Sequence, residues 1–316
     1  MRHSVRTAAR LALLAGGIVL VSWLVSSAGY SRVGDAFRDA GPSLPFVVAL
    51  ELLIVMTDAA AARTLLGDAA GSVRASTWMR SMALAYAAGI VLPAGRAAGE
   101  GARASVLGAD IGLVRAAAAC SRVQTAALFG TAAASLVAAA AALAASTTLA
   151  LLLAGNAVIC TILAVAVLSI ARWRRLGRWL RTRWPALAVQ RSLAIAPGAT
   201  AAASLLCTLG RALQAAQYTV VLGAVGGAVS LRAGLVAQGI HLVGATAGDA
   251  IPNQLGTNEG AFRMFAGTLG LADAPARALS IALVVRATQL GLALVAFVVA
   301  TLVSGGSADA ATRRGG

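Results

Sequence analysis

The sequence predicts an all-α polytopic membrane protein with a single integral membrane domain over residues 1–316. Hydrophobic residues make up 59% of the chain and charged residues 12%, and the mean hydropathy is +0.83. Apolar stretches near the ~20 residues that a helix needs to cross a bilayer recur along the whole chain. No long polar segment remains for a soluble domain, so the composition excludes the soluble globular class.

About six of these stretches are long enough for full transmembrane helices. The first follows Arg2, Arg6 and Arg10, a pattern that also fits a signal peptide, but the number of spans behind it favours an uncleaved first helix. The predicted spans cover about residues 10–29, 43–62, 123–145, 148–170, 195–225 and 276–303.

Two further apolar stretches are interrupted by proline and polar residues. Residues 81–92 end at Pro93 and residues 233–251 end at Pro252, and each is followed by a polar loop and a weaker apolar return. Irregular backbone at membrane depth is tolerated only where it is buried in protein or lines a wet cavity. We therefore predict two re-entrant helical hairpins, which open to opposite sides of the membrane; the alternative is that either hairpin is two full crossings, which leaves both chain ends on the same side.

The arginine distribution predicts the orientation. The net charge of +15 comes from arginine, because the chain contains no lysine. Arginine-rich short loops stay inside, which places both chain ends in the cytoplasm of a multi-pass protein of the cytoplasmic membrane. Residues 171–191 are the strongest inside marker: either a helix on an anionic membrane surface or a basic loop that only fixes topology. The arginines that would contact the surface are Arg172, Arg174, Arg175, Arg178, Arg181 and Arg183.

The two halves of the chain, about residues 8–146 and 147–304, have the same order of elements: two spans, a hairpin and a span. LPAGRAAGEGAR, at 92–103, and IPNQLGTNEGAFR, at 251–263, both place Glu-Gly-Ala seven positions after a proline. The match is informative because the chain has only three glutamates. Since the halves start on opposite sides, the pattern indicates an inverted-topology repeat, the plan of many secondary transporters.

The charges in the hairpins are the first candidates for a substrate site. An ionised side chain inside a bilayer costs roughly 2.5–3.5 kcal/mol on insertion scales, so it marks a site or a buried ion pair. The spacings Glu100–Arg103 and Glu259–Arg263 allow such pairs on one helix face. Alternatively, arginine would hold a lipid phosphate and glutamate a cationic group or a proton. The substrate-binding candidates are Glu100, Arg103, Arg122, Asn258, Glu259, Arg263 and Arg286.

Three further ionisable residues are candidates for a proton or ion relay. His241 and Asp249 are eight residues apart on roughly one face, where they could pass a proton or take part in an interhelical hydrogen bond. Glu51 lies deep in the second span without a local partner, whereas Asp58 could pair with Arg63.

Several classes of chemistry are excluded or unsupported. Without lysine there is neither a Walker A loop nor a Schiff base. The two histidines and three cysteines lack metal-ligand spacing, and no nucleophile–base set supports a lipid-modifying enzyme. We expect no metal, no cofactor, no nucleic-acid partner and no enzymatic activity.

The motifs LPAGRAAGEGARASVLG and IPNQLGTNEGAF, the latter followed by ALSIALVVRATQLGLAL, resemble the transmembrane region of lysylphosphatidylglycerol synthases and their stand-alone, flippase-like relatives. The resemblance covers roughly residues 10–303 and does not include an aminoacyl-transferase domain. It implies movement of a phospholipid, such as an aminoacylated phosphatidylglycerol, between leaflets.

The leading hypothesis is therefore a flippase-like protein whose partner is a phospholipid. The alternatives are a secondary transporter of a small soluble anion or amino acid, and a non-catalytic partner of an envelope lipid enzyme; a homo-oligomer is also compatible. The leading hypothesis requires the two hairpins to meet, so that their acidic and guanidinium side chains share one pocket.

Overall fold

The computed structural model describes residues 22–23, 26, 30–170, 197–251, 254–271 and 275–312. Within these ranges the chain is helical and contains no strand, which confirms the all-α prediction. Most of the first predicted span and the whole basic segment 171–191 lie outside the described residues. Four described segments are long and apolar enough to cross a membrane: Arg38–Ser72, Leu113–Ala142, Thr147–Ser169 and Pro275–Val303.

The first half of the chain contains five described α-helices, with short 3-10 turns at Gly41–Ser43 and Gly67–Ser72. They are α2 (Tyr30–Ala40), α3 (Leu44–Leu66), α4 (Ala75–Val91), α5 (Gly95–Ile111) and α6 (Leu113–Ala142).

The second half also contains five described α-helices, with a 3-10 turn at Ala266–Leu269. They are α7 (Thr147–Ile170), α10 (Pro197–Ala224), α11 (Leu231–Ala247), α12 (Thr257–Met264) and α13 (Pro275–Thr312).

Three helices depart from the predicted boundaries. Helix α2 lies between the first two predicted spans, and α6 begins at Leu113 rather than near residue 123. The predicted start of this span is wrong because the first turn of α6 carries Arg115, whose long stem lets a helix keep a charge at its end. Helix α13, with 38 residues, continues well beyond the predicted end. At 1.5 Å per residue it is about 57 Å long, nearly twice the thickness of the hydrocarbon core.

Both predicted hairpins are present. Hairpin one (residues 75–111) consists of α4 and α5, which pack against each other and are joined by three residues. Glycine permits the close approach: a Cβ on Gly99 would lie 2.6 Å from the carbonyl oxygen of Ala85. Hairpin two (residues 231–269) consists of α11, a nine-residue connection, α12 and the 3-10 turn. Each 17-residue arm is about 25 Å long, shorter than a full crossing.

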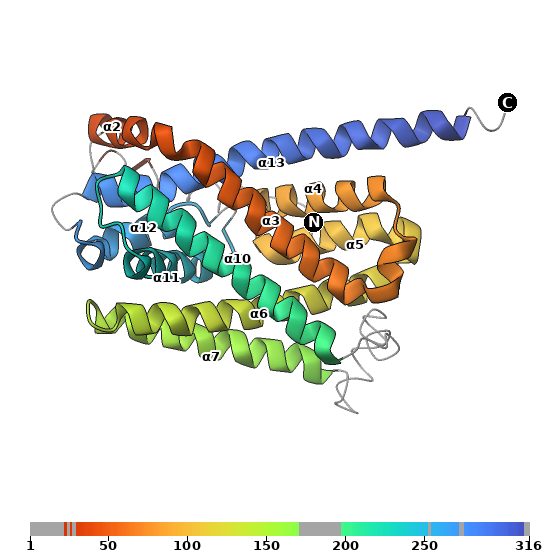
Figure 1. Ribbon diagram of the computed structural model, residues 1–316, viewed down its shortest axis with the longest axis horizontal. Helices are drawn as coiled ribbons and strands as arrows, with labels where there is room; N and C mark the ends of the chain where they lie inside the picture. Colours follow the sequence, from red (N-terminus) through yellow and green to blue (C-terminus); the bar gives the residue numbers. More distant parts are fainter. Residues whose placement is uncertain are drawn as a thin grey trace, which may run out of the picture.

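The tips of the two hairpins touch each other. The backbone N–H of Ala94, at the tip of hairpin one, donates to the carbonyl oxygen of Asp249 in hairpin two at 2.9 Å. Figure 1 shows hairpin one at one end of the molecule and α11 and α12 at the other, with α3 and α10 running obliquely between them. The predicted meeting of the hairpins is therefore confirmed at the level of the backbone.

The helices between the hairpins form the scaffold. Helix α10 packs against α3, α6 and α11, and α6 packs against α7. The largest buried cluster surrounds Tyr218, whose ring lies 5.6 Å from that of Phe262 in α12. This cluster fixes hairpin two against α10, and thereby fixes the position of its tip.

Candidate functional site

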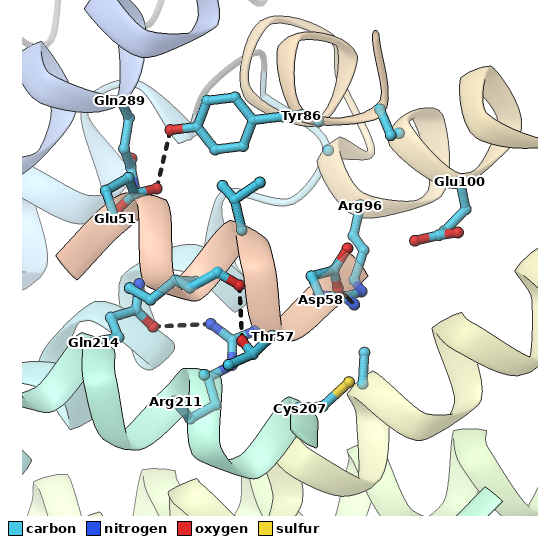
Figure 2. Close-up of a pocket in the computed structure, with 18 of the residues that line it drawn as sticks. Glu51, Thr57, Asp58, Tyr86, Arg96, Glu100, Cys207, Arg211, Gln214 and Gln289 are labelled. Carbon is cyan, nitrogen blue, oxygen red and sulfur yellow. Dashed lines mark hydrogen bonds and ion pairs between the residues drawn. The ribbon is translucent and has the colours of Figure 1, made fainter. Parts of the chain in front are cut away.

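A polar cavity of about 250 Å³ lies where the hairpins meet. Helices α3, α4, α5 and α10 supply most of its wall, and hairpin two contributes His241 and Gln254. Figure 2 shows charged and amide side chains converging on it from several helices. The charged side chains in the lining are Glu51, Asp58, Arg96, Glu100, Arg103 and Arg211.

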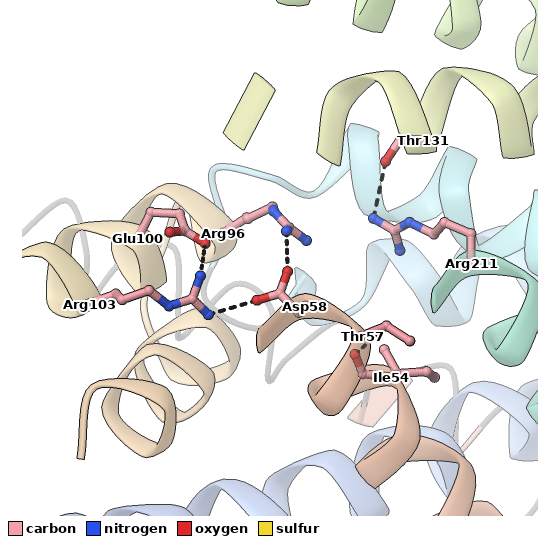
Figure 3. Close-up of polar contacts among 8 residues, drawn as sticks. All are labelled: Ile54, Thr57, Asp58, Arg96, Glu100, Arg103, Thr131 and Arg211. Atoms are coloured by element: carbon pink, nitrogen blue, oxygen red, sulfur yellow. Dashed lines mark hydrogen bonds and ion pairs between the residues drawn. The ribbon is translucent and has the colours of Figure 1, made fainter. Parts of the chain in front are cut away.

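Four of these charged side chains form a chain of ion pairs (Figure 3). Arg103 donates to Glu100 Oε1 and to Asp58 Oδ2, both at 2.7 Å, and Arg96 pairs with Asp58 Oδ1. The predicted Glu100–Arg103 pair is thus confirmed, whereas Asp58 pairs across to α5 and not with Arg63. Because two carboxylates face two guanidinium groups, this quartet has no net charge.

Glu51 is the third carboxyl group of the cavity, and only neutral groups bind it. Its side chain accepts hydrogen bonds from the Tyr86 hydroxyl at 3.0 Å, Gln217 Nε2 at 2.9 Å and Gln289 Nε2 at 3.4 Å. Glu51 is 3% exposed, and within the described ranges no basic group forms a salt bridge with it. The predicted lack of a local partner is correct, because all three donors come from other helices.

Arg211 is the third guanidinium group of the cavity. Its Nη1 donates to Gln214 Oε1 at 2.9 Å, and its Nη2 donates to Thr131 Oγ1 at 3.2 Å. In the part of the chain that the structure describes, no carboxylate pairs with it. The neighbouring Gly210 lets α3 approach, since a Cβ there would lie 2.7 Å from Thr57 Oγ1. The cavity therefore holds one carboxyl and one guanidinium group without ionic partners.

Glu259 and Arg286 lie outside the cavity lining, which corrects the prediction that both hairpin glutamates share one pocket. Glu259 has no exposed surface, and its Oε1 lies 3.0 Å from Arg286 Nε. Its Oε2 accepts the backbone N–H of Gly256, and Arg286 donates to the carbonyl oxygen of Gln254. The Glu259–Arg286 pair therefore binds the backbone of the hairpin-two connection at Gly256 and Gln254. Gln254 also lines the cavity.

Two other predicted pairings are not formed. Arg263 does not bind Glu259 but lies over the ring of Trp23, 5.5 Å from its centroid. Asp249 is exposed and follows the end of α11, so it does not share a helix face with His241. Among the described residues, no hydrogen bond joins these two side chains.

His241 and two other candidates occupy different surroundings. His241 lies in the cavity lining, and its Nδ1 forms a hydrogen bond with the Asn258 side-chain amide, whose nitrogen is 2.8 Å away. This is the interhelical hydrogen bond that was the alternative to a relay. Asn258 itself and Arg122 are not among the lining residues.

Several lining residues were not among the sequence candidates, namely Asp58, Arg96, Arg211 and their amide neighbours. A signal for them exists in the sequence. Arg211, Gln214 and Gln217 recur at three-residue spacing in an otherwise apolar span, which indicates one polar helix face. Glu51 and Asp58 are seven residues apart and share a face of α3 in the same way.

Comparison with protein families matches residues 8–296 to the lysylphosphatidylglycerol synthase TM region. No curated protein and no solved structure matches the chain. The matched region includes both hairpins and every residue of the cavity lining, and it relates the protein to lipid modification or flipping in membranes. The chain therefore belongs to the family of the lysylphosphatidylglycerol synthase transmembrane region.

Proposed function

We propose that the protein moves a phospholipid, or a related lipid, between the leaflets of the cytoplasmic membrane. The observation that carries the proposal is the charged cavity between the two hairpin tips, inside a bundle whose outer surface is apolar. In this mechanism the headgroup passes through the cavity while the acyl chains remain in the surrounding lipid.

The chemistry of the cavity suits a headgroup. A charged or hydrogen-bonding group in hydrocarbon loses its water, and this loss is the main barrier to unassisted lipid movement. The cavity replaces water with guanidinium groups, amides and the Tyr86 hydroxyl. Guanidinium groups bind phosphate oxygens in a bidentate manner, which makes Arg211 the principal contact for a phosphate in this proposal.

The surface around the cavity suits acyl chains. Large apolar side chains are exposed along α7 and α13, for example Leu151, Ile162 and Leu294. In addition, the side chains of Asp58 and Arg96, which line the cavity, are 25% and 34% accessible. In the proposed mechanism, a headgroup enters the cavity while its chains stay in the lipid.

A soluble anion is the second candidate substrate, because Arg211 lacks a carboxylate partner within the described residues and the cavity volume is only about 250 Å³. Such a protein would be a secondary transporter. The experiment that tests the first proposal can also detect this outcome.

The test uses purified protein in liposomes that contain a fluorescent phospholipid. Movement between leaflets is measured as the fraction that an impermeant quencher reaches. We expect Arg211→Gln to slow movement at least roughly tenfold, since a hydrogen bond to a charged group contributes about 1.5–3 kcal/mol. Arg63→Gln is the matched control, because Arg63 is exposed on α3 outside the cavity.

Equal movement in protein-free liposomes and in liposomes with wild-type protein would overturn the proposal. Uptake of inorganic phosphate or an amino acid without lipid movement would identify a soluble-substrate transporter instead. A change in the mass of the phospholipid would identify an enzyme.

A further inference from the structure

Glu51 and Arg211 are opposite charges that line the same cavity and bind only neutral side chains among the described residues. The remaining four charged groups neutralise one another in the quartet. Any change in the net charge of the cavity therefore arises most easily at Glu51 or Arg211. Because arginine does not lose its proton in proteins, Glu51 is the group that can change.

The hydrogen bonds around Glu51 accommodate a proton on one of its two oxygens. Gln217 Nε2 donates to the Val47 carbonyl oxygen at 3.0 Å and to Glu51 Oε2 at 2.9 Å, which uses both of its hydrogens and fixes Oε2 as an acceptor. Oε1 faces the Tyr86 hydroxyl at 3.0 Å. A hydroxyl can reverse its role, so a proton on Oε1 can be donated to Tyr86, whose own hydrogen then turns toward the cavity.

Among the described residues that line the cavity, each carboxyl group other than Glu51 belongs to an ion pair. Arg286 on α13 is bound to Glu259, and the lining contribution of α6 is the uncharged Ala127. The titratable or charged groups that line the cavity beside Glu51 are Asp58 on α3, Tyr86 on α4, Arg96, Glu100 and Arg103 on α5, Cys207 and Arg211 on α10, and His241 on α11. Tyr218 on α10 lies behind His241, with 5.5 Å between the ring centroids.

Protonation of Glu51 changes the charge that an incoming anion meets. With Glu51 ionised, the six charged lining groups sum to zero, because three carboxylates face three guanidinium groups. With Glu51 protonated, the sum is +1, and the positive charge is centred on Arg211. Charges interact strongly in a site with little water, so an anion at Arg211 is held more tightly in the second state.

We propose that Glu51 is a proton-binding site coupled to anion binding at Arg211, so that a phosphate ester and a proton bind together more tightly than either does alone. The coupling is reciprocal: a bound phosphate favours the protonated carboxylic acid, and release of the phosphate favours return of that proton to water. The identification of the phosphate ester as a lipid headgroup rests on the proposed function. The proton coupling does not.

The first test measures binding to the full-length protein in detergent at pH 8 and pH 5. The probes are dihexanoylphosphatidylglycerol and glycerophosphoglycerol, two phosphodiesters whose own charge does not change in this range. We expect wild-type affinity to rise on the order of tenfold at the lower pH, within the usual range of coupling between sites. Binding of only the acylated probe identifies the ligand as a lipid, whereas equal binding of both identifies a soluble phosphodiester.

Variants assign the effect to residues. Glu51→Gln should bind with the low-pH affinity at both pH values, because it resembles the protonated acid. Arg211→Gln should lose at least tenfold in affinity at both pH values, consistent with loss of a charged hydrogen bond, while Arg63→Gln should behave like wild type. Binding without pH dependence in the wild type would overturn the proposal. So would pH dependence that survives in Glu51→Gln but disappears in His241→Gln.

A second test needs no substitution. Dicyclohexylcarbodiimide, an apolar reagent, reacts with protonated carboxyl groups: the acid adds across a C=N bond, and the O-acylisourea rearranges to a stable N-acylurea. Mass spectrometry should find this adduct on Glu51 at pH 5 and much less of it at pH 8. Absence of the adduct at pH 5, or equal labelling at both pH values, would contradict a proton site.

The two proposals fail separately. Lipid movement in liposomes that is independent of pH and unchanged in Glu51→Gln would leave the proposed function intact and overturn the coupling. Binding that depends on pH as described, in a protein that moves no lipid, would do the opposite.

Discussion

In hairpin one, Glu100 lines the cavity and binds Arg103. In hairpin two, Glu259 is fully buried outside the cavity lining and binds Arg286 of α13. Both glutamates follow a proline by seven residues and precede Gly-Ala. The same short sequence therefore contributes to a binding surface in one half of the molecule and to internal support in the other.

The length of the connection explains the difference. In hairpin one, three residues separate the helices, so Glu100 is the sixth residue of α5 and projects from its second turn. In hairpin two, nine residues separate α11 from α12, so Glu259 is only the third residue of its helix. A glutamate at that position reaches back to the free N–H groups at the helix start, as Glu259 does to Gly256 at 2.9 Å.

The largest expected effect comes from breaking the buried pair of hairpin two. Glu259→Ala leaves Arg286 buried without its carboxylate, and we expect the free energy of unfolding in detergent to fall by about 3–5 kcal/mol. Glu100→Ala should cost less, about 2 kcal/mol, because Arg103 keeps its bond to Asp58.

The control is the double substitution Glu259→Leu with Arg286→Leu, which removes both charges and should recover much of the lost stability. Equal losses for Glu259→Ala and Glu100→Ala would show that the two glutamates have similar roles after all.

Intermediate effects are expected at glycines. A Cβ on Gly99 would meet the Ala85 backbone oxygen at 2.6 Å, and one on Gly248 would meet Thr257 Oγ1 at 2.0 Å. We expect alanine at either position to lower the unfolding free energy by about 1–3 kcal/mol, because tightly packed sites resist extra atoms. Gly101 and Gly260, which are equivalent in the two motifs, have no atom within 4 Å of a new Cβ.

Alanine at Gly101 or Gly260 is thus the matched control, and it should leave stability unchanged or raise it by up to about 1 kcal/mol through helix propensity. Thermal unfolding of the four variants measures both expectations. A loss at Gly101 as large as that at Gly99 would contradict the close packing of α4 on α5.

The smallest expected effect is at the open end of hairpin one. Arg74 donates to both carboxylate oxygens of Asp110, with the shortest contact at 2.8 Å, and this bonding lowers the pKa of Asp110 below its usual value. A carboxyl group with a lowered pKa adds stability above its unfolded-state pKa, near 3.9, and loses it as the pH falls through its folded-state value. Asp110→Asn should therefore lower the unfolding midpoint slightly at pH 7, and by less as the pH drops below about 4. A difference between the two proteins that does not shrink in acid would contradict this assignment.

Much of the fold was predictable from the sequence, because apolar length and proline position report directly on helices in a membrane. Helices α3, α7 and α10 begin and end within a few residues of their predicted limits. The predicted boundaries were wrong at α6 and α13, because these helices continue past the apolar run into charged or small residues.

The site was predictable only in part. Glu100 with Arg103 follows from helical spacing, since residues three apart share a face. Pairs between distant segments, such as Arg103 with Asp58 or Arg286 with Glu259, depend on how the helices pack, which spacing along one chain does not reveal. Glu51 and Arg211 were difficult to rank for the same reason: what distinguishes them is the absence of an ionic partner among the described residues, and that is a property of the packed structure.

The contact between the hairpin tips uses only main-chain atoms, the N–H of Ala94 and the carbonyl oxygen of Asp249. A main-chain bond does not depend on which side chains flank it. Position 249 contributes only its carbonyl oxygen, whereas position 94 is restricted by its backbone: Ala94 has a φ of +57°, in the left-handed region that favours glycine or asparagine and that proline cannot adopt. The junction between the hairpins therefore restricts its sequence through backbone conformation, whereas the charged walls beside it depend on side-chain chemistry.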